Sequence, residues 1–120
     1  MAVSERLICS SDALLEGGLG VRFEVLWAGE MTPAFVARYA GKAVAYFNRC
    51  GHVPVEIDFN AGEFFDDSGL YFVCATHGAL YDPYSGACRG GPCNGRGLHK
   101  LAVEERAGQV FLIEGKASHE

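Results

Sequence analysis

Apolar and polar residues alternate along much of the chain with the period of two that is typical of β-strands. Residues 21–25 (VRFEV) alternate apolar with charged side chains, as a half-buried strand does. Two apolar runs, residues 35–39 and 43–47, flank the link AGK, and two more, residues 101–105 and 110–114, flank RAGQ. Each pair is predicted to form a hairpin. LYFVC, residues 70–74, is a further apolar run. We therefore predict an antiparallel all-β fold, a sandwich or small barrel.

Glycine positions and chain length complete this picture. No segment shows a long helical period, and the 16 glycines lie mostly in links and turns. They are densest in GACRGGPCNGRGL, residues 86–98, which we predict to be a loop. A chain of 120 residues suits one domain around one core, so residues 1–120 are expected to form a single domain.

Composition and charge narrow the classes of function. The chain is 49% hydrophobic and 21% charged, as soluble globular proteins are, and lacks both an apolar run of about 18 residues and a secretory signal. We expect a cytoplasmic protein with no membrane contact. A net charge of −5 argues against nucleic acid and suits a partner with a basic face. Five cysteines without an export signal favour metal or redox chemistry over a disulfide framework.

Two short Cys/His pairs are the candidate metal ligands. Cys50 and His52 form C-x-H after a predicted strand, and Cys74 and His77 form C-x-x-H after another. Two thiolates and two imidazoles suit a tetrahedral zinc or a two-iron two-sulfur cluster with histidine on one iron. Zinc pairs usually place like ligands together, whereas here each pair is mixed. Mixed pairs fit two irons, with one ligand from each pair on each iron.

The residues around these pairs resemble a known family. CGH and CATHGALYDPYSGACRGGPC resemble the two ligand boxes of Rieske iron–sulfur proteins. The resemblance implies a [2Fe-2S] cluster, with Cys50 and Cys74 on the inner iron and His52 and His77 on the outer, more exposed iron. It covers most of the chain, although only the middle third is specific. It also implies a cluster-binding part at about residues 48–95.

The resemblance extends to residues beyond the ligands. Tyr81 resembles a tyrosine whose hydroxyl donates to a cluster sulfur, and the pair Gly91 and Pro92 matches the loop that covers the cluster. Two departures stand out: the interval between the boxes is a few residues longer than usual, and Ala79 replaces a serine that donates to a sulfur in cytochrome-complex members. The disulfide of those members has no counterpart within these boxes. Cys88 and Cys93 are close enough in sequence for a disulfide that braces the covering loop, but a cytoplasmic protein favours free thiols, so this pairing stays open.

Other candidate residues have simpler interpretations. Cys9 is expected to be a small buried strand residue. His99 is assigned to a surface or packing position, His119 to the chain tail and Trp27 to the core. Glu63, Asp66 and Asp67 are assigned to a solvated acidic turn, with a docking patch as the alternative. No arrangement resembles a nucleophile with its base or a nucleotide-binding loop.

The resemblance implies an electron-transfer protein that is not itself an enzyme. The chain most resembles a soluble Rieske-type ferredoxin, whose partners are a flavin-dependent reductase and a terminal oxygenase. Three alternatives remain open: the small Rieske subunit of a nitrite reductase, a redox-sensing interaction module, and a zinc-bound structural domain.

Overall fold

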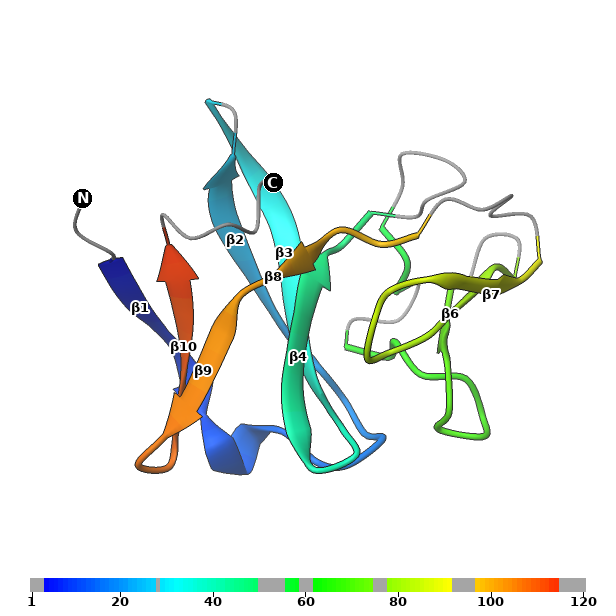
Figure 1. The fold of residues 1–120 in the computed structure, drawn as a ribbon, viewed down its shortest axis with the longest axis horizontal. Coiled ribbons are helices and arrows are strands. Elements are labelled where there is room, and N and C mark those ends of the chain that lie inside the picture. Colours follow the sequence, from blue (N-terminus) through cyan, green and yellow to red (C-terminus); the bar gives the residue numbers. More distant parts are fainter. Residues whose placement is uncertain are drawn as a thin grey trace.

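The structure is a computed structural model that describes residues 4–27, 29–49, 56–58, 62–74, 78–91 and 97–114. It confirms the predicted all-β class: the strands form three antiparallel sheets, and the described residues add only the short 3-10 turn η1 (Ser11–Ala13). Figure 1 shows two larger sheets on the left and centre, with a small sheet to the right. No helix in these ranges is long and apolar enough to cross a membrane.

The strands are distributed over the sheets as follows. The first sheet has the order β1-β10-β9 and contains β1 (Ser4–Ser10), β10 (Gln109–Glu114) and β9 (Val103–Arg106). The second has the order β2-β3-β4-β8 and contains β2 (Val21–Trp27), β3 (Glu30–Tyr39), β4 (Lys42–Phe47) and β8 (Lys100–Leu101). The small sheet has the order β5-β6-β7 and contains β5 (Phe72–Val73), β6 (Leu80–Tyr81) and β7 (Cys88–Gly90).

Both predicted hairpins form, and both turn on an Ala-Gly pair. In β3–β4, Tyr39 pairs with Lys42 around Ala40 and Gly41, whose φ angles are 54° and 78°. Two positive φ angles in a two-residue loop are the pattern of a type I′ turn, which matches the twist of paired strands. The left-handed Ala40 is held by Glu16, whose carboxylate accepts the N–H groups of residues 40 and 41 at 2.6 and 2.8 Å. The β9–β10 hairpin turns in the same way at residues 107–108.

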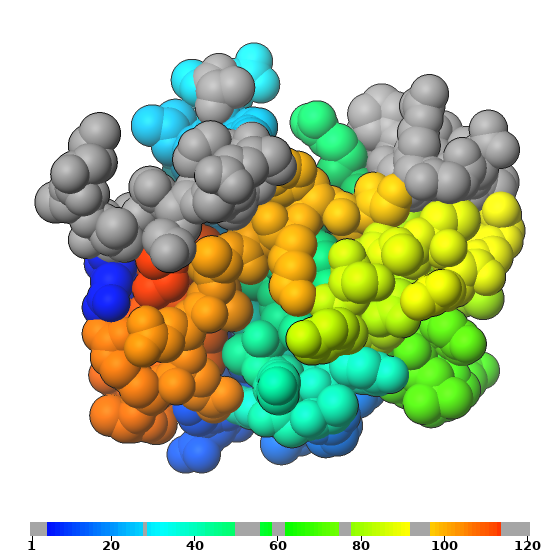
Figure 2. Space-filling view, in the orientation of Figure 1, coloured from blue at the N-terminus to red at the C-terminus, as the bar shows by residue number. Residues whose placement is uncertain are grey.

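The β3–β4 hairpin is buried on both faces. Successive side chains of a strand point to opposite faces, so alternate residues of β3 and β4 enter different core clusters. One cluster lies between the two larger sheets and contains Leu14, Val25, Ala34, Val36, Ala45, Phe47, Leu101, Val110 and Leu112. The other joins the hairpin to the small sheet and contains Phe35, Ala37, Val44, Tyr46, Ile57, Phe64, Phe72, Cys74, Ala79, Tyr81 and Leu98. In space-filling view the small sheet accordingly lies directly against the larger ones (Figure 2).

Three strands differ from the sequence-based expectation. Apart from a strand position for Cys9, β1 was not predicted, because SERLICS has no regular alternation; it forms by pairing with β10 along its length. β6 and β7 are only two and three residues long, too short to produce a pattern. The predicted loop over residues 86–98 therefore contains β7, and the strand predicted over residues 70–74 is limited to β5.

Candidate metal centre

The second Cys/His box begins directly after β5. Cys74 is completely buried in the core cluster beneath the small sheet and is not in a disulfide. Its N–H donates to the carbonyl of Ala79 at 2.9 Å, and its carbonyl accepts the N–H of Gly78 at 2.8 Å. Gly78 has a φ of 78°, which glycine adopts readily. Backbone hydrogen bonds therefore close the loop that carries this box and fix Cys74 at its base.

Gly91 lies against this loop. It follows β7 with a φ of 77°, and a Cβ placed on it would lie 2.9 Å from both the Cα of Ala79 and the carbonyl oxygen of Gly78. Only a residue without a side chain allows the two backbone segments to come so close. The structure thus places Gly91 against Gly78 and Ala79, directly after the second box, and its role in a covering loop stays a prediction. The adjacent Pro92 is outside the described residues.

The segment that contains Gly91 is closed at its base by the backbone. The N–H of Leu98 donates to the carbonyl of Gly86 at 2.8 Å. A Cβ on Gly86 would lie 2.8 Å from both the carbonyl oxygen of Leu98 and Cε1 of Tyr46, so this contact also depends on a glycine. Residues 86 and 98 are thereby joined on the surface of β4.

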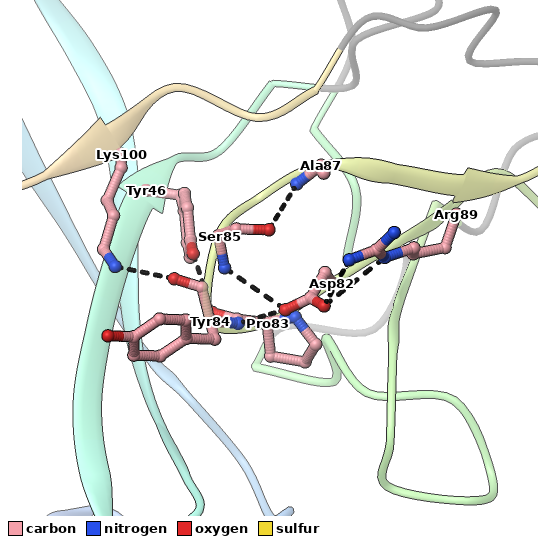
Figure 3. Close-up of polar contacts among 8 residues, drawn as sticks. All are labelled: Tyr46, Asp82, Pro83, Tyr84, Ser85, Ala87, Arg89 and Lys100. Carbon is pink, nitrogen blue, oxygen red and sulfur yellow. Dashed lines mark hydrogen bonds and ion pairs between the residues drawn. The ribbon is translucent and has the colours of Figure 1, made fainter.

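A turn anchored by Asp82 connects β6 to β7 (Figure 3). Its Oδ1 accepts the N–H groups of Tyr84 and Ser85 at 2.8 and 3.2 Å, and its Oδ2 is 3.1 Å from Nη2 of Arg89. Burial raises the pKa of the Asp82 carboxyl, but these backbone and guanidinium donors outweigh it, so the pKa falls below its ordinary value.

Two further hydrogen bonds tie this turn to β4 and β8. The buried hydroxyl of Tyr46 donates to the carbonyl of Pro83 at 2.7 Å, and burial is the main cause of the raised pKa of Tyr46. Lys100 donates from Nζ to the carbonyl of Tyr84 at 2.6 Å, and its ammonium lies 4.6 Å from the centre of that ring. The small sheet is therefore fixed to the strands beneath it.

The first box is bounded by a buried polar pair that the sequence analysis missed. Asn48, directly after β4, is 1% exposed, and Asp58 is 6% exposed. Nδ2 of Asn48 donates to Oδ1 of Asp58 at 2.8 Å, and Oδ1 of Asn48 accepts the N–H of Ile57 at 2.9 Å. The available signal was a single asparagine after a strand and a single aspartate between apolar residues. Neither forms a pattern.

The other predicted site residues have the following outcomes. Tyr81 is completely buried, between Phe72 of β5 and Cys88 of β7 in strand register. Cys88 is disulfide-bonded, a point that the sequence left open, and its partner is outside the described residues. Also outside them are Cys50, His52, His77, His119 and Cys93. The described residues contain no group of three or more potential metal ligands.

The remaining candidates lie away from this site or at its margin. Cys9 is in β1, as expected, but only half-buried; burial raises the pKa of its thiol. His99 is exposed and its ring lies 5.2 Å from that of Trp27, which is only partly buried and so packs at the edge of the core. In the predicted acidic turn Glu63 and Asp67 are exposed, whereas Asp66 is half-buried; Asp66 and Asp67 lie at the end of the residue 64–73 hairpin opposite Cys74.

Comparison with known sequences identifies the family. Residues 6–114 match the Rieske [2Fe-2S] domain. The chain belongs to the Rieske [2Fe-2S] domain family. No curated protein sequence matches it.

Solved structures confirm the Rieske fold. The Sphingomonas yanoikuyae B1 ferredoxin has a TM-score of 0.72 and 20% identity, with 92% of this chain and 99% of that chain covered. The ferredoxin of carbazole 1,9a-dioxygenase from Nocardioides aromaticivorans IC177 gives 0.72 and 21%, with coverage of 91% and 96%. The terminal oxygenase of that system gives 0.70 and 19%, with coverage of 93% and 30%.

The described part of the site fits a Rieske cluster. Cys74 lies at the base of a closed loop and is shielded from water, which suits a cysteine ligand because a bound iron would stabilise its thiolate in place of solvent. The close approach of Gly91 to Gly78 and Ala79 covers the same loop. The two Cys/His pairs supply the donor set that this cluster type requires.

Proposed function

We propose that this chain is a Rieske-type ferredoxin that carries single electrons from a flavin-dependent reductase to a terminal oxygenase. The supporting observation is the position of Cys74, buried in a backbone-closed loop beneath Gly91, in a chain that matches the family over residues 6–114. The carrier role is proposed by likeness to the ferredoxins, of which the chain covers 99% in one case, whereas it covers 30% of a terminal oxygenase. Another similar structure is a complex of oxygenase and ferredoxin.

The proposed ligand set is Cys50, His52, Cys74 and His77. The cysteines hold one iron and the histidines hold the other, so each box contributes to both irons. When bound, the [2Fe-2S] cluster gains and loses one electron at a time. The chain keeps the Cys74 end dry and places Gly91 over the loop. Electrons leave by the histidine side, and the protein itself converts no substrate.

Charges around the boxes refine the expected partner. Residues 49–56, 74–80 and 88–98 contain three arginines, at 49, 89 and 96, and one acidic residue, Glu56, although the whole chain has a net charge of −5; Arg89 pairs with Asp82 of the adjacent turn. Arg49 is exposed, and the acidic turn at Asp66 lies at the other end of its hairpin from Cys74. The docking face is therefore proposed to be cationic and to suit an acidic partner surface, in contrast to the expectation from net charge alone.

Ligand substitution tests the proposed cluster. Iron and sulfide content and the EPR spectrum of the reduced protein should show one [2Fe-2S] cluster per chain in the wild type. Each of Cys50→Ala, His52→Ala, Cys74→Ala and His77→Ala should lose it, because an incomplete ligand set cannot retain the metal. Cys9→Ala and His99→Ala are matched controls and should keep the full signal. Zinc in place of iron, or a fully loaded ligand variant, would contradict the ligand set.

Transfer kinetics test the carrier role. The reductase and terminal oxygenase encoded nearest to this chain's gene are the test pair, and stopped-flow absorbance follows reduction by one and reoxidation by the other. We expect both steps to occur with one electron per chain. Stable co-purification with a large sirohaem subunit, or slow transfer together with redox-dependent partner binding, would instead identify a nitrite reductase subunit or a sensor.

A further inference from the structure

The buried pair Asn48–Asp58 joins the two ends of the first-box segment. Cys50 and His52 lie within residues 49–56, which follow Asn48 and precede Ile57. The side chain of Asn48 bonds to the backbone N–H of Ile57 and to the carboxylate of Asp58, at 2.9 and 2.8 Å. One side chain therefore closes the loop that the proposed first-box ligands occupy.

Both members of the pair are anchored to rigid parts of the fold. The N–H of Asn48 donates to the carbonyl of Pro33 at 2.8 Å, which extends the β3–β4 ladder by one residue. Oδ2 of Asp58 accepts the N–H of Gly62 at 3.0 Å and lies 3.5 Å from Nε of Arg22 in β2. The Asp58 side chain is 0% exposed, yet both of its oxygens have partners, so its burial is compensated.

Such a network fixes position as well as adding stability. Apolar contacts are not directional, whereas hydrogen bonds in a buried network specify one arrangement of the groups that they join. A metal site requires its ligands to be held within about 0.5 Å of the productive geometry. Loop 49–56 has to present a thiolate and an imidazole to two different irons, so the spacing of its ends matters.

We infer that Asn48 and Asp58 are positioning residues for the cluster, which set the geometry of the first box without contacting the metal. This inference rests on the proposed ligand set. Supporting residues around metal ligands typically change metal affinity about 10- to 100-fold when they are replaced. Loss of the pair should therefore weaken cluster retention while the strands remain folded.

The chemistry of the pair provides a specific test by exchange. In Asp58→Asn, a side-chain NH₂ group replaces one of the two carboxylate oxygens. This NH₂ group must then face another donor, either the side-chain NH₂ of Asn48 or the backbone N–H of Gly62. In Asn48→Asp, two carboxylates face each other. In the double variant Asn48→Asp/Asp58→Asn, the amide at 58 can donate to the carboxylate at 48, and both positions keep acceptors for Ile57 and Gly62. The exchange therefore reverses the direction of the hydrogen bond between residues 48 and 58, keeps the bonds from Ile57 and Gly62 as they are, and moves the charge that faces Arg22 from position 58 to position 48.

The experiment compares these three variants with the wild-type holoprotein. The rate of iron release to a chelator, the EPR spectrum of the reduced protein and visible circular dichroism report on the cluster, and far-UV circular dichroism reports on the strands. Val110→Ala is the control for general destabilisation, since Val110 is completely buried in the core cluster between the larger sheets. We expect each single variant to release iron about 10-fold faster or more, with an altered EPR spectrum. The exchange should restore both, and Val110→Ala should keep the wild-type spectrum.

Three outcomes would overturn the inference. They are single variants with wild-type spectra and release rates, an exchange variant that fails to fold or to bind the cluster, and a Val110→Ala protein with the same spectral change. The Cys50→Ala variant separates this failure from that of the ligand set. If Cys50→Ala loses the cluster while the pair variants behave as wild type, only the positioning role is wrong. If Cys50→Ala stays fully loaded, the ligand set itself is wrong.

Discussion

The loops that carry the two boxes are closed by different means. The second-box loop is closed by the backbone, with reciprocal hydrogen bonds from Cys74 to Ala79 and from Gly78 to Cys74. The first-box loop is closed by the side chains of Asn48 and Asp58. Backbone closure depends on chain conformation and on glycines, whereas side-chain closure depends on two particular residues. Substitution of these two side chains should therefore affect the first box more than the second. Substitution of the glycines should affect the second box more than the first.

The largest effect on the backbone-closed side should come from Gly91→Ala. Its Cβ would meet backbone atoms at 2.9 Å, and the φ of 77° is unfavourable for alanine. We expect a loss of about 2–3 kcal/mol in the free energy of unfolding, measured by urea denaturation, together with loss of cluster.

Its neighbour provides the matched control. A Cβ on Gly90 would lie 3.7 Å from Cδ1 of Leu80, an ordinary contact. Gly90→Ala should stay close to wild type, and equal losses for both variants would show that the approach of Gly91 to the second box is not the cause.

The next effect should come from Tyr46→Phe, which removes the hydrogen bond between β4 and the turn at Pro83 without altering either box. Loss of the hydroxyl leaves the carbonyl of Pro83 without this donor, and we expect a cost of about 1–2 kcal/mol in urea denaturation. Tyr84→Phe is the control because its ring is 58% exposed. A Tyr46→Phe protein as stable as Tyr84→Phe would mean that the bond to Pro83 does not hold the sheet in place.

A smaller effect should appear in the reduction potential, through Ala79, directly before β6, and Tyr81, within β6. A hydroxyl that donates to a cluster sulfur stabilises the reduced, more negative state, and about 1 kcal/mol corresponds to about 40 mV for one electron. We expect Tyr81→Phe to lower the midpoint and Ala79→Ser to raise it, each by some tens of millivolts in protein-film voltammetry. An unchanged midpoint in Tyr81→Phe would leave this buried tyrosine with a packing role alone.

The smallest effect should be a pH dependence at the β6–β7 turn. The pKa of Asp82 is lower in the folded protein than its ordinary value of 3.8, so the unfolded chain binds the proton more readily in acid. The stabilisation by Asp82 is complete above that ordinary value and is lost as pH falls through the lower, folded one. Asp82→Asn should therefore be less stable than wild type at pH 7, and this difference should shrink below about pH 4. A constant difference in urea midpoint between pH 7 and pH 3 would exclude this role.

Sequence analysis predicted the elements that depend on local patterns. The β3–β4 and β9–β10 hairpins were predicted because apolar runs flank Ala-Gly turns, whereas the cluster-covering role of Gly91 stays a prediction from its motif. β1 was missed because its partner, β10, lies at the other end of the chain. The pairing of Asn48 with Asp58 was missed for a similar reason, since a tertiary hydrogen bond between two isolated polar residues has no period. The charge around the boxes could not be predicted from composition either, because a net charge of −5 says nothing about where the charged residues lie.

The way in which the chain enters and leaves the small sheet has an evolutionary consequence. β4 and β8 are adjacent in their sheet, with Ala45 opposite Leu101 and Tyr46 opposite Lys100, although more than fifty residues of sequence separate them. The N–H of Phe47 also donates to the carbonyl of His99 at 3.0 Å. The segment between β4 and β8 is thus inserted at a single point of the sandwich that the two larger sheets form. The strands of these two sheets pair with one another without it. Such an insertion can lengthen, shorten or be exchanged between relatives as a module, provided that its core contacts with β3 and β4 are kept.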